Sequence, residues 1–167
     1  MKINLYIFAF LCLIILTQCG QGLDPIDPSH LQGTARITGI INFKGGKGAW
    51  PPASDSVNQI RVACFKKYPP DNIIQTITSG DAYFMQASTL LNVDTANFSI
   101  DIPDVPIEIK YIVVAEQYSS SILNWRAVGV YTITGDMNNP TSIYVQPGQT
   151  YQIILNVDFK NLPITPF

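Results

Sequence analysis

The sequence predicts an all-β fold for most of this 167-residue chain: a single antiparallel β-sandwich of seven or eight strands, transthyretin-like or immunoglobulin-like in architecture. Short apolar runs recur along residues 34–160, and several alternate apolar with polar residues, which is the period of a half-buried strand. Gly, Pro, Asn and Asp separate these runs at the spacing of sandwich turns. No stretch of useful length has the helical period.

Alternation places the expected strands in order along the chain. The first puts Ile37 and Ile41 on one face, with Gly39 between them. Residues 111–115 are apolar on both faces, which favours a central strand covered on both sides. The expected strands cover residues 35–43, 57–65, 97–102, 108–118, 125–134, 142–145 and 151–159. The pattern of residues 71–91 is ambiguous: residues 73–77 could form a short strand, and residues 87–91 another strand or a single helical turn.

Proline and glycine mark the expected turns, and the strand faces predict the core. Pro103 and Pro106 are expected to end the strand at 97–102, and Pro147 with Gly148 is expected to form a tight hairpin between the last two strands. The predicted core residues share inward-facing positions: Ile37, Ile41, Ile60, Val62, Phe98, Ile100, Val113, Val130, Ile153 and Leu155.

Composition limits the class of protein. Hydrophobic residues make up 47% of the chain and charged residues 13%, which is too apolar for a disordered protein. The net charge is −2, and the ten Lys and Arg are scattered. Because nucleic-acid binding depends on clustered positive charge, we expect no nucleic-acid partner. The length suits one ordinary domain after processing.

The N-terminus has the features of an export signal. Lys2 supplies a positive charge, and residues 5–16 form an unbroken apolar run of signal-peptide length. The segment 16–20, LTQCG, resembles the lipobox of bacterial lipoproteins, although Gln18 stands where Gly, Ala or Ser is usual. The resemblance implies a signal peptide at 1–18, lipid on Cys19, and a membrane partner reached through that lipid. Gly20, in place of the Asp linked to inner-membrane retention in some bacteria, favours the outer membrane of the cell envelope.

Residues 19–33 are expected to form a flexible tether, residues 34–160 the sandwich domain, and residues 161–167 a C-terminal tail. The tether is rich in Gly, Pro and Asp and lacks apolar periodicity. Of the three cysteines, Cys12 would be removed and Cys19 lipidated, which leaves Cys64 alone in the domain. Its apolar neighbours predict a buried, unreactive thiol.

Four segments carry a resemblance to a family. They are GIINF at 39–43, WPP at 50–52, IRVACF at 60–65 and VQPGQTY at 145–151. In these segments the chain resembles bacterial envelope lipoproteins with a transthyretin-like, or carboxypeptidase-regulatory-like, β-sandwich. The resemblance implies a sandwich fold and no single activity, since such domains serve as accessory, adhesive or ligand-binding modules.

Residues suited to catalysis or to metal binding are sparse. The only histidine, His30, lies in the expected tether, where it cannot be held beside a nucleophile, and a zinc site normally needs several His or Cys. The loop Gly45–Gly48 lacks the spacing of a phosphate-binding loop and reads as a flexible connection. Asp101 and Asp104 have no distinctive spacing for acid–base work. We therefore expect no cofactor, no metal and no enzymatic activity.

Aromatic residues near the strand ends are the most suggestive feature. Trp50 and Tyr68 stand beside proline pairs, Tyr118 ends a strand, and Trp125 begins the next. Aromatics gathered at one end of a sandwich can form a stacking platform, or they can simply close the core. The sequence thus predicts a membrane-tethered, non-enzymatic binding or structural module with an unidentified protein, peptide or glycan ligand. The alternatives are a glycan- or small-ligand-binding module that uses Trp50, Tyr68 and Tyr118, and a His-free hydrolase.

Overall fold

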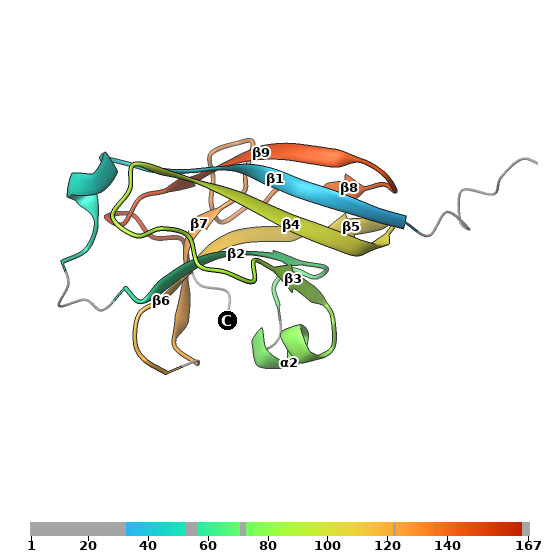
Figure 1. Cartoon of the computed structure of the whole chain (residues 1–167), viewed down its shortest axis with the longest axis horizontal. Helices are drawn as coiled ribbons and strands as arrows, with labels where there is room; N and C mark the ends of the chain where they lie inside the picture. Colours follow the sequence, from blue (N-terminus) through green and yellow to red (C-terminus); the bar gives the residue numbers. More distant parts are fainter. Residues whose placement is uncertain (1–32, 53–56, 71–72, 122, 165–167) are drawn as a thin grey trace, which may run out of the picture. The chain divides into compact units, whose positions relative to one another are not determined.

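The computed structural model of the chain divides into two units, residues 1–31 and 32–167. It describes residues 33–52, 57–70, 73–121 and 123–164, all of them in the second unit (Figure 1). The predicted signal peptide, the lipid site at Cys19 and the tether that contains His30 lie outside the described residues.

Two sheets face each other and confirm the predicted all-β sandwich (Figure 1). One sheet has the strand order β4(Thr95–Val105), β1(Gly33–Phe43), β9(Thr150–Val157). The other has the order β3(Ala82–Phe84), β2(Gln59–Phe65), β6(Tyr111–Gln117), β7(Trp125–Val130). The remaining elements are a two-stranded sheet of β5(Ile107–Ile109) and β8(Ile143–Val145), the 3₁₀ turn η2(Gly46–Ala49) and the short helix α2(Ile73–Thr78).

Strand β1 is the central strand of the three-stranded sheet. The sequence predicts antiparallel pairing, but one of the two pairings of β1 is parallel. It pairs with β4 antiparallel and with β9 parallel, in the register Arg36 to Thr150 through Phe43 to Val157. The expected hairpin at Pro147–Gly148 is therefore wrong, because β8 pairs with β5 while β9 pairs with β1. The described residues contain nine strands, because the segment 108–118 forms two strands and the sequence does not predict β3.

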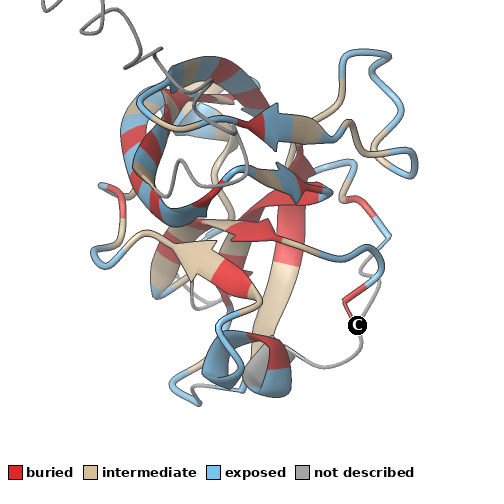
Figure 2. Cartoon of the chain, turned by 90° about the vertical axis from the view of Figure 1, so that its right-hand side faces the viewer, coloured by how far each residue is buried: buried red, intermediate tan, exposed pale blue. Residues whose placement is uncertain are grey.

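The predicted core residues are all buried. Alternate residues of the three-stranded sheet point inward, and Figure 2 shows this alternation as stripes along the strands. Eight of the predicted residues lie in the cluster between the sheets, whereas Val113 and Val130 belong to a second cluster. That cluster lies on the other face of the four-stranded sheet, so β6 is covered on both faces, as its sequence predicts.

Gly39 lies where its neighbouring strands in the three-stranded sheet leave no room for a side chain. A Cβ atom at this position would lie 2.8 Å from the Phe98 ring and closer still to the carbonyl oxygen of Ile153. The glycine therefore provides the space that the Phe98 ring occupies between Ile37 and Ile41 on the inner face.

Three segments depart from the predicted elements. Residues 73–78 form α2 rather than a strand, because β3 occupies the place beside β2. The predicted strand at 108–118 divides at Lys110 into β5 and β6, and residues 87–91 form no regular element. Strand β4 continues past Pro103, because the register shifts opposite Thr34 and leaves one extra residue there.

The C-terminal segment also differs from a free tail over the part that the structure describes. Leu162 packs against the core, and Pro163 is buried. The folded domain therefore extends at least to residue 163.

Replacement of Val62 by Asp tests the assignment of the inner face. Val62 has no exposed surface, so the aspartate would place an unpaired charge in the core at a cost of several kcal/mol. Since the total stability of such a domain is about 5–15 kcal/mol, we expect Val62→Asp to unfold most of it in a urea titration followed by circular dichroism. The control Gln152→Asp, at an exposed strand position, should change stability by less than about 1 kcal/mol. Equal stability of the two variants would contradict the assignment.

Candidate functional site: a cavity beside Trp50

The structure does not bring the three predicted ligand-binding aromatics together. In the pairing of β2 with β6, Gln59 lies opposite Gln117 at one end and Phe65 lies opposite Tyr111 at the other. The loop that carries Trp50 leads into the Gln59 end, and Tyr118 directly follows Gln117. Tyr68 follows Phe65, so it lies at the opposite end. The three rings therefore cannot form a single stacking platform.

Trp50 is half-buried and is held from three directions. Its indole Nε1 donates a hydrogen bond of 2.9 Å to the carbonyl oxygen of Val93. Its ring centroid lies 4.5 Å from that of Phe43 and 5.0 Å from that of Phe159, in tilted contacts. Trp50 therefore closes one end of the core, and the same side chain lines a cavity at that end.

Tyr68 and Tyr118 each have partners within the fold. The Tyr68 ring lies 5.0 Å from the ring of Tyr111, and its hydroxyl donates to the carbonyl oxygen of Asn138 at 3.4 Å. Tyr118 lies under the guanidinium of Arg126, 5.5 Å from the ring centroid. Both rings remain partly exposed, but no cavity described below includes either of them.

The cavity beside Trp50, called here the Trp50 cavity, has a volume of about 310 Å³. That is at the lower end of the range for small-molecule sites. Its described walls combine an indole, two prolines and two aliphatic side chains with two asparagines, and none of these described lining residues is charged. The lining residues are Trp50, Pro51, Pro52, Val57, Asn58, Leu91 and Asn92.

Backbone hydrogen bonds anchor both sides of the Trp50 cavity. Phe43 donates to the carbonyl oxygen of Asp94 at 3.0 Å, and Asn58 donates to the carbonyl oxygen of Gln117 at 2.9 Å. Asn92 has a φ of 56°, in the left-handed region that asparagine tolerates better than most residues. These contacts fix the segments of the Trp50 cavity that carry Asn58 and Asn92.

The glycine-rich loop next to the Trp50 cavity carries an internal acceptor. Gly45 and Gly46 have positive φ angles of 80° and 63°, and the next amide, that of Lys47, donates to the Asp94 carboxylate at 2.7 Å. A carboxylate of the chain itself therefore occupies the place that a phosphate oxygen would need. This agrees with the prediction that the loop is a connection and not a phosphate-binding loop.

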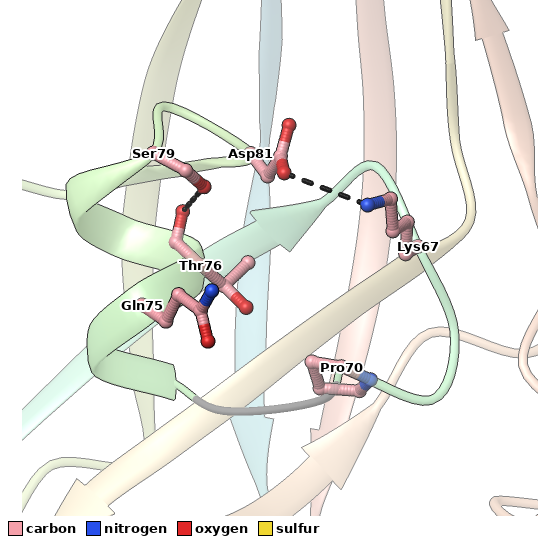
Figure 3. A pocket seen from close by; sticks show the side chains of 6 residues that line it. All are labelled: Lys67, Pro70, Gln75, Thr76, Ser79 and Asp81. Carbon is pink, nitrogen blue, oxygen red and sulfur yellow. Dashed lines mark hydrogen bonds and ion pairs between the residues drawn. The ribbon is translucent and has the colours of Figure 1, made fainter.

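Two other depressions are less suited to a ligand. One lies between α2 and the strands β2 and β3, measures about 100 Å³, and contains the ion pair of Lys67 with Asp81 at 3.7 Å (Figure 3). The other is an open depression of about 210 Å³ beside the ion pair of Arg36 with Asp101. In both, the charges are already matched within the chain.

The remaining candidates for chemistry are engaged elsewhere. Asp104 accepts a hydrogen bond of 3.0 Å from the Tyr83 hydroxyl and lies 3.7 Å from the Lys66 amine. Cys64 is fully buried, and burial raises the pKa of its thiol, which confirms the predicted buried cysteine. Over the described ranges, no group of three or more His, Cys, Asp or Glu side chains lies close enough to hold a metal ion.

Comparisons with known proteins give no match. No family model, no curated protein and no solved structure matches the chain. Among the helices within residues 33–164 that the structure describes, none is long and apolar enough to span a membrane.

Sequence reasoning identified Trp50 as a site residue but missed the rest of the cavity. Leu91 and Asn92 are distant from Trp50 in the chain, and they reach it because the loop before β4 returns along the end of β2. No local motif marks these residues. The only lining residues with a sequence signal beside them are Pro51 and Pro52, which directly follow Trp50.

Replacement of Trp50 by Phe measures its role in closing the core. Phenylalanine keeps a ring against Phe43 but cannot donate to the Val93 carbonyl, so we expect a loss of about 1–2 kcal/mol in the free energy of unfolding. The matched control is Trp125→Phe, since among the described residues the partly buried Trp125 indole has no hydrogen bond and no contact with another aromatic ring, and the Arg61 guanidinium lies 6.0 Å from its ring centroid. Thermal unfolding should show the larger decrease for Trp50→Phe. A smaller decrease than in the control would show that the indole is not a structural contact.

Proposed function

We propose that this chain is a non-enzymatic binding module, held at the cell envelope by lipid on Cys19, and that it binds its ligand in the Trp50 cavity. The observation that carries the proposal is a cavity of about 310 Å³ at one end of the sandwich, whose described lining residues combine an indole, prolines and aliphatic side chains with two asparagines. A concave site of this size with both apolar and polar groups is the usual first candidate for a ligand site.

The chemistry of the lining favours binding over turnover. General acid–base catalysis needs a His, a carboxylate, a Lys, a Tyr or a Cys beside the reacting atom. Among the described residues that line the Trp50 cavity, none carries such a group. Indole, proline, aliphatic and amide groups can hold a ligand but do not act as general acids or bases near neutral pH.

The direction of β1 supports a role in binding something beyond the membrane surface. This strand begins at Gly33, where the expected tether joins the domain, and ends at Phe43, beside Trp50. Its 11 residues span about 35 Å at the usual rise of a strand. The Trp50 cavity therefore lies at the end of β1 opposite to Gly33, the residue at which a lipid-anchored chain would enter the strand (Figure 1).

Blocking the Trp50 cavity without disturbing the core tests the site. Asn58 lines the cavity and is exposed, so Asn58→Trp should fill the space while leaving Trp50 in its contacts. The matched control is Asn97→Trp, at an exposed asparagine on the outer face of β4. The full chain would be applied to an array of glycans and peptides. We expect the signal bound by Asn58→Trp to fall to one tenth or less of the signal bound by Asn97→Trp.

If Asn58→Trp and Asn97→Trp give the same set of ligands with the same signal, the Trp50 cavity is not the binding site. A loss of signal in both variants, with unfolding visible by circular dichroism, would be resolved by the smaller substitution Asn58→Ala.

Lipidation can be tested separately from ligand binding. Replacement of Cys19 by Ser removes the thiol that the acyl chain requires, so the variant should remain uncleaved or leave the membrane fraction. Mass spectrometry of the wild-type N-terminus should show a mature chain that begins at acylated Cys19. An unmodified mature N-terminus would contradict the lipid anchor and leave the binding proposal standing.

A further inference from the structure

We infer that the free edge of strand β4 is a self-association surface, on which a second copy of this chain pairs to form one continuous six-stranded sheet. This inference goes beyond the proposed function and does not depend on the Trp50 cavity. Three features of β4 carry it: the direction of its peptide groups, the lack of the usual protection of an edge strand, and the side chains that self-pairing would bring together.

Strand β4 lies at one edge of the three-stranded sheet and has a long run of outward-facing peptide groups (Figure 1). The Phe43 amide donates to the Asp94 carbonyl oxygen at 3.0 Å, which fixes the phase of the pairing between β1 and β4. Because peptide groups alternate in direction along an antiparallel strand, the even-numbered residues of β4 bond to β1 and the odd-numbered residues face away from it. The outward-facing peptide groups are those of Thr95, Asn97, Ser99 and Asp101.

The described part of the chain leaves this run uncovered. Among the residues that the structure describes, none forms a backbone hydrogen bond with these four outward-facing peptide groups. The segment after β3 follows β2 instead, since the Met85 amide donates to the Val62 carbonyl oxygen at 3.0 Å. The Tyr83 hydroxyl does reach β4, but it donates to the Asp104 side chain, beyond the run.

The edge of β4 also lacks the features by which proteins usually prevent edge pairing. Lysine, proline, a bulge or an inward-pointing charge commonly serves this purpose on an edge strand. Residues 95–102 contain none of them, because their inward side chains are apolar and their register with β1 is unbroken. At the other edge of the sheet, β7 approaches β9 so closely that a Cβ added to Gly129 would lie 2.5 Å from the Asn156 carbonyl oxygen. Strand β4 therefore offers the longer open edge.

A twofold axis at Phe98 pairs every outward-facing group of the run with one of a second copy. In this register Thr95 lies opposite Asp101 of the second copy, and Asn97 lies opposite Ser99 of the second copy. Each of these facing pairs exchanges two backbone hydrogen bonds, as in any antiparallel ladder. Because both copies use the same surface, the association closes at two chains.

The side chains of the edge match their own copies on both faces. Asp101 is ion-paired with Arg36 of its own chain at 2.6 Å, and in this register it faces a threonine and not a like charge. The other facing positions on the outer face are also polar, whereas the inward positions are apolar: Ala96, Phe98 and Ile100. A second copy therefore matches both faces, whereas a charged or uniformly polar segment would match only one.

Charges introduced at the facing positions test the pairing and its register. The full chain would be measured by sedimentation equilibrium in a detergent whose density is matched by the buffer, and we expect a concentration-dependent dimer. In Asn97→Lys/Ser99→Lys, lysines would face lysines across the axis, so the dissociation constant should rise about tenfold or more. In Asn97→Asp/Ser99→Lys, each lysine would face an aspartate, so the dissociation constant should stay within about threefold of the wild-type value.

The matched control is Thr150→Lys/Gln152→Lys, at exposed positions of the same spacing on β9. It adds the same charge to the same sheet and should change the dissociation constant less than about twofold. Circular dichroism checks the fold of each variant. If Asn97→Lys/Ser99→Lys does not fold, the single substitutions Asn97→Lys and Ser99→Lys replace it, each with a smaller increase expected.

Several results would overturn the inference. One is a chain that stays monomeric at all concentrations, including a monomer that takes a foreign strand on this edge. Another is a dimer that the β9 control weakens as much as Asn97→Lys/Ser99→Lys does, or that neither variant weakens, as association through lipid alone would give. Dissociation of Asn97→Asp/Ser99→Lys to the same extent as the double lysine variant would exclude the pairing centred on Phe98.

Discussion

The parallel pairing of β1 with β9 is the constraint on which the candidate site depends. It brings the first strand of the domain beside the last and sets Phe43 opposite Val157. Phe159, two residues further, then stacks 6.0 Å from the Phe43 ring. These two rings form the support against which Trp50 packs, and the position of Trp50 defines one wall of the cavity. A change of register between β1 and β9 would therefore move the site as well as the core.

The sequence predicts the sandwich well wherever a strand has one inward face. The alternation along residues 35–43 and 97–102 gives the correct inward residues, because period two alone decides which side chains share a face. It cannot choose the partner of a strand, since pairing depends on contacts far apart in the chain. For that reason Pro147 and Gly148 were assigned to a hairpin, although they connect strands in two different sheets. The helix α2 at residues 73–78 has a related explanation. A short apolar run does not by itself decide between strand and helix, so contacts with distant parts of the chain determine which one forms.

The site was predictable only in part, for a related reason. Tryptophan beside two prolines is a local signal, and it led to Trp50. The same reasoning chose Tyr68, which the register places at the other end of β2. Nothing in the sequence around Asn58 or Asn92 marks either residue as part of a site. They line the same cavity only because the fold brings two distant segments together. A cavity is a property of the arrangement, and the sequence reveals only the residues that are unusual by themselves.

The double role of Trp50 explains how a domain with little chemistry can still hold a site. The Trp50 ring closes the core and is held in place by its hydrogen bond to Val93. A ring that is already fixed loses little conformational entropy when a ligand packs against it. Under the proposed function, one side chain would contribute to both stability and binding. Of the two exposed asparagines in the lining, Asn92 has a φ of 56°, which restricts the position to residues that tolerate the left-handed region, whereas Asn58 is under no such restriction. Under the proposed function, ligand preference could therefore change at position 58 while Trp50 and its aromatic support stay constant.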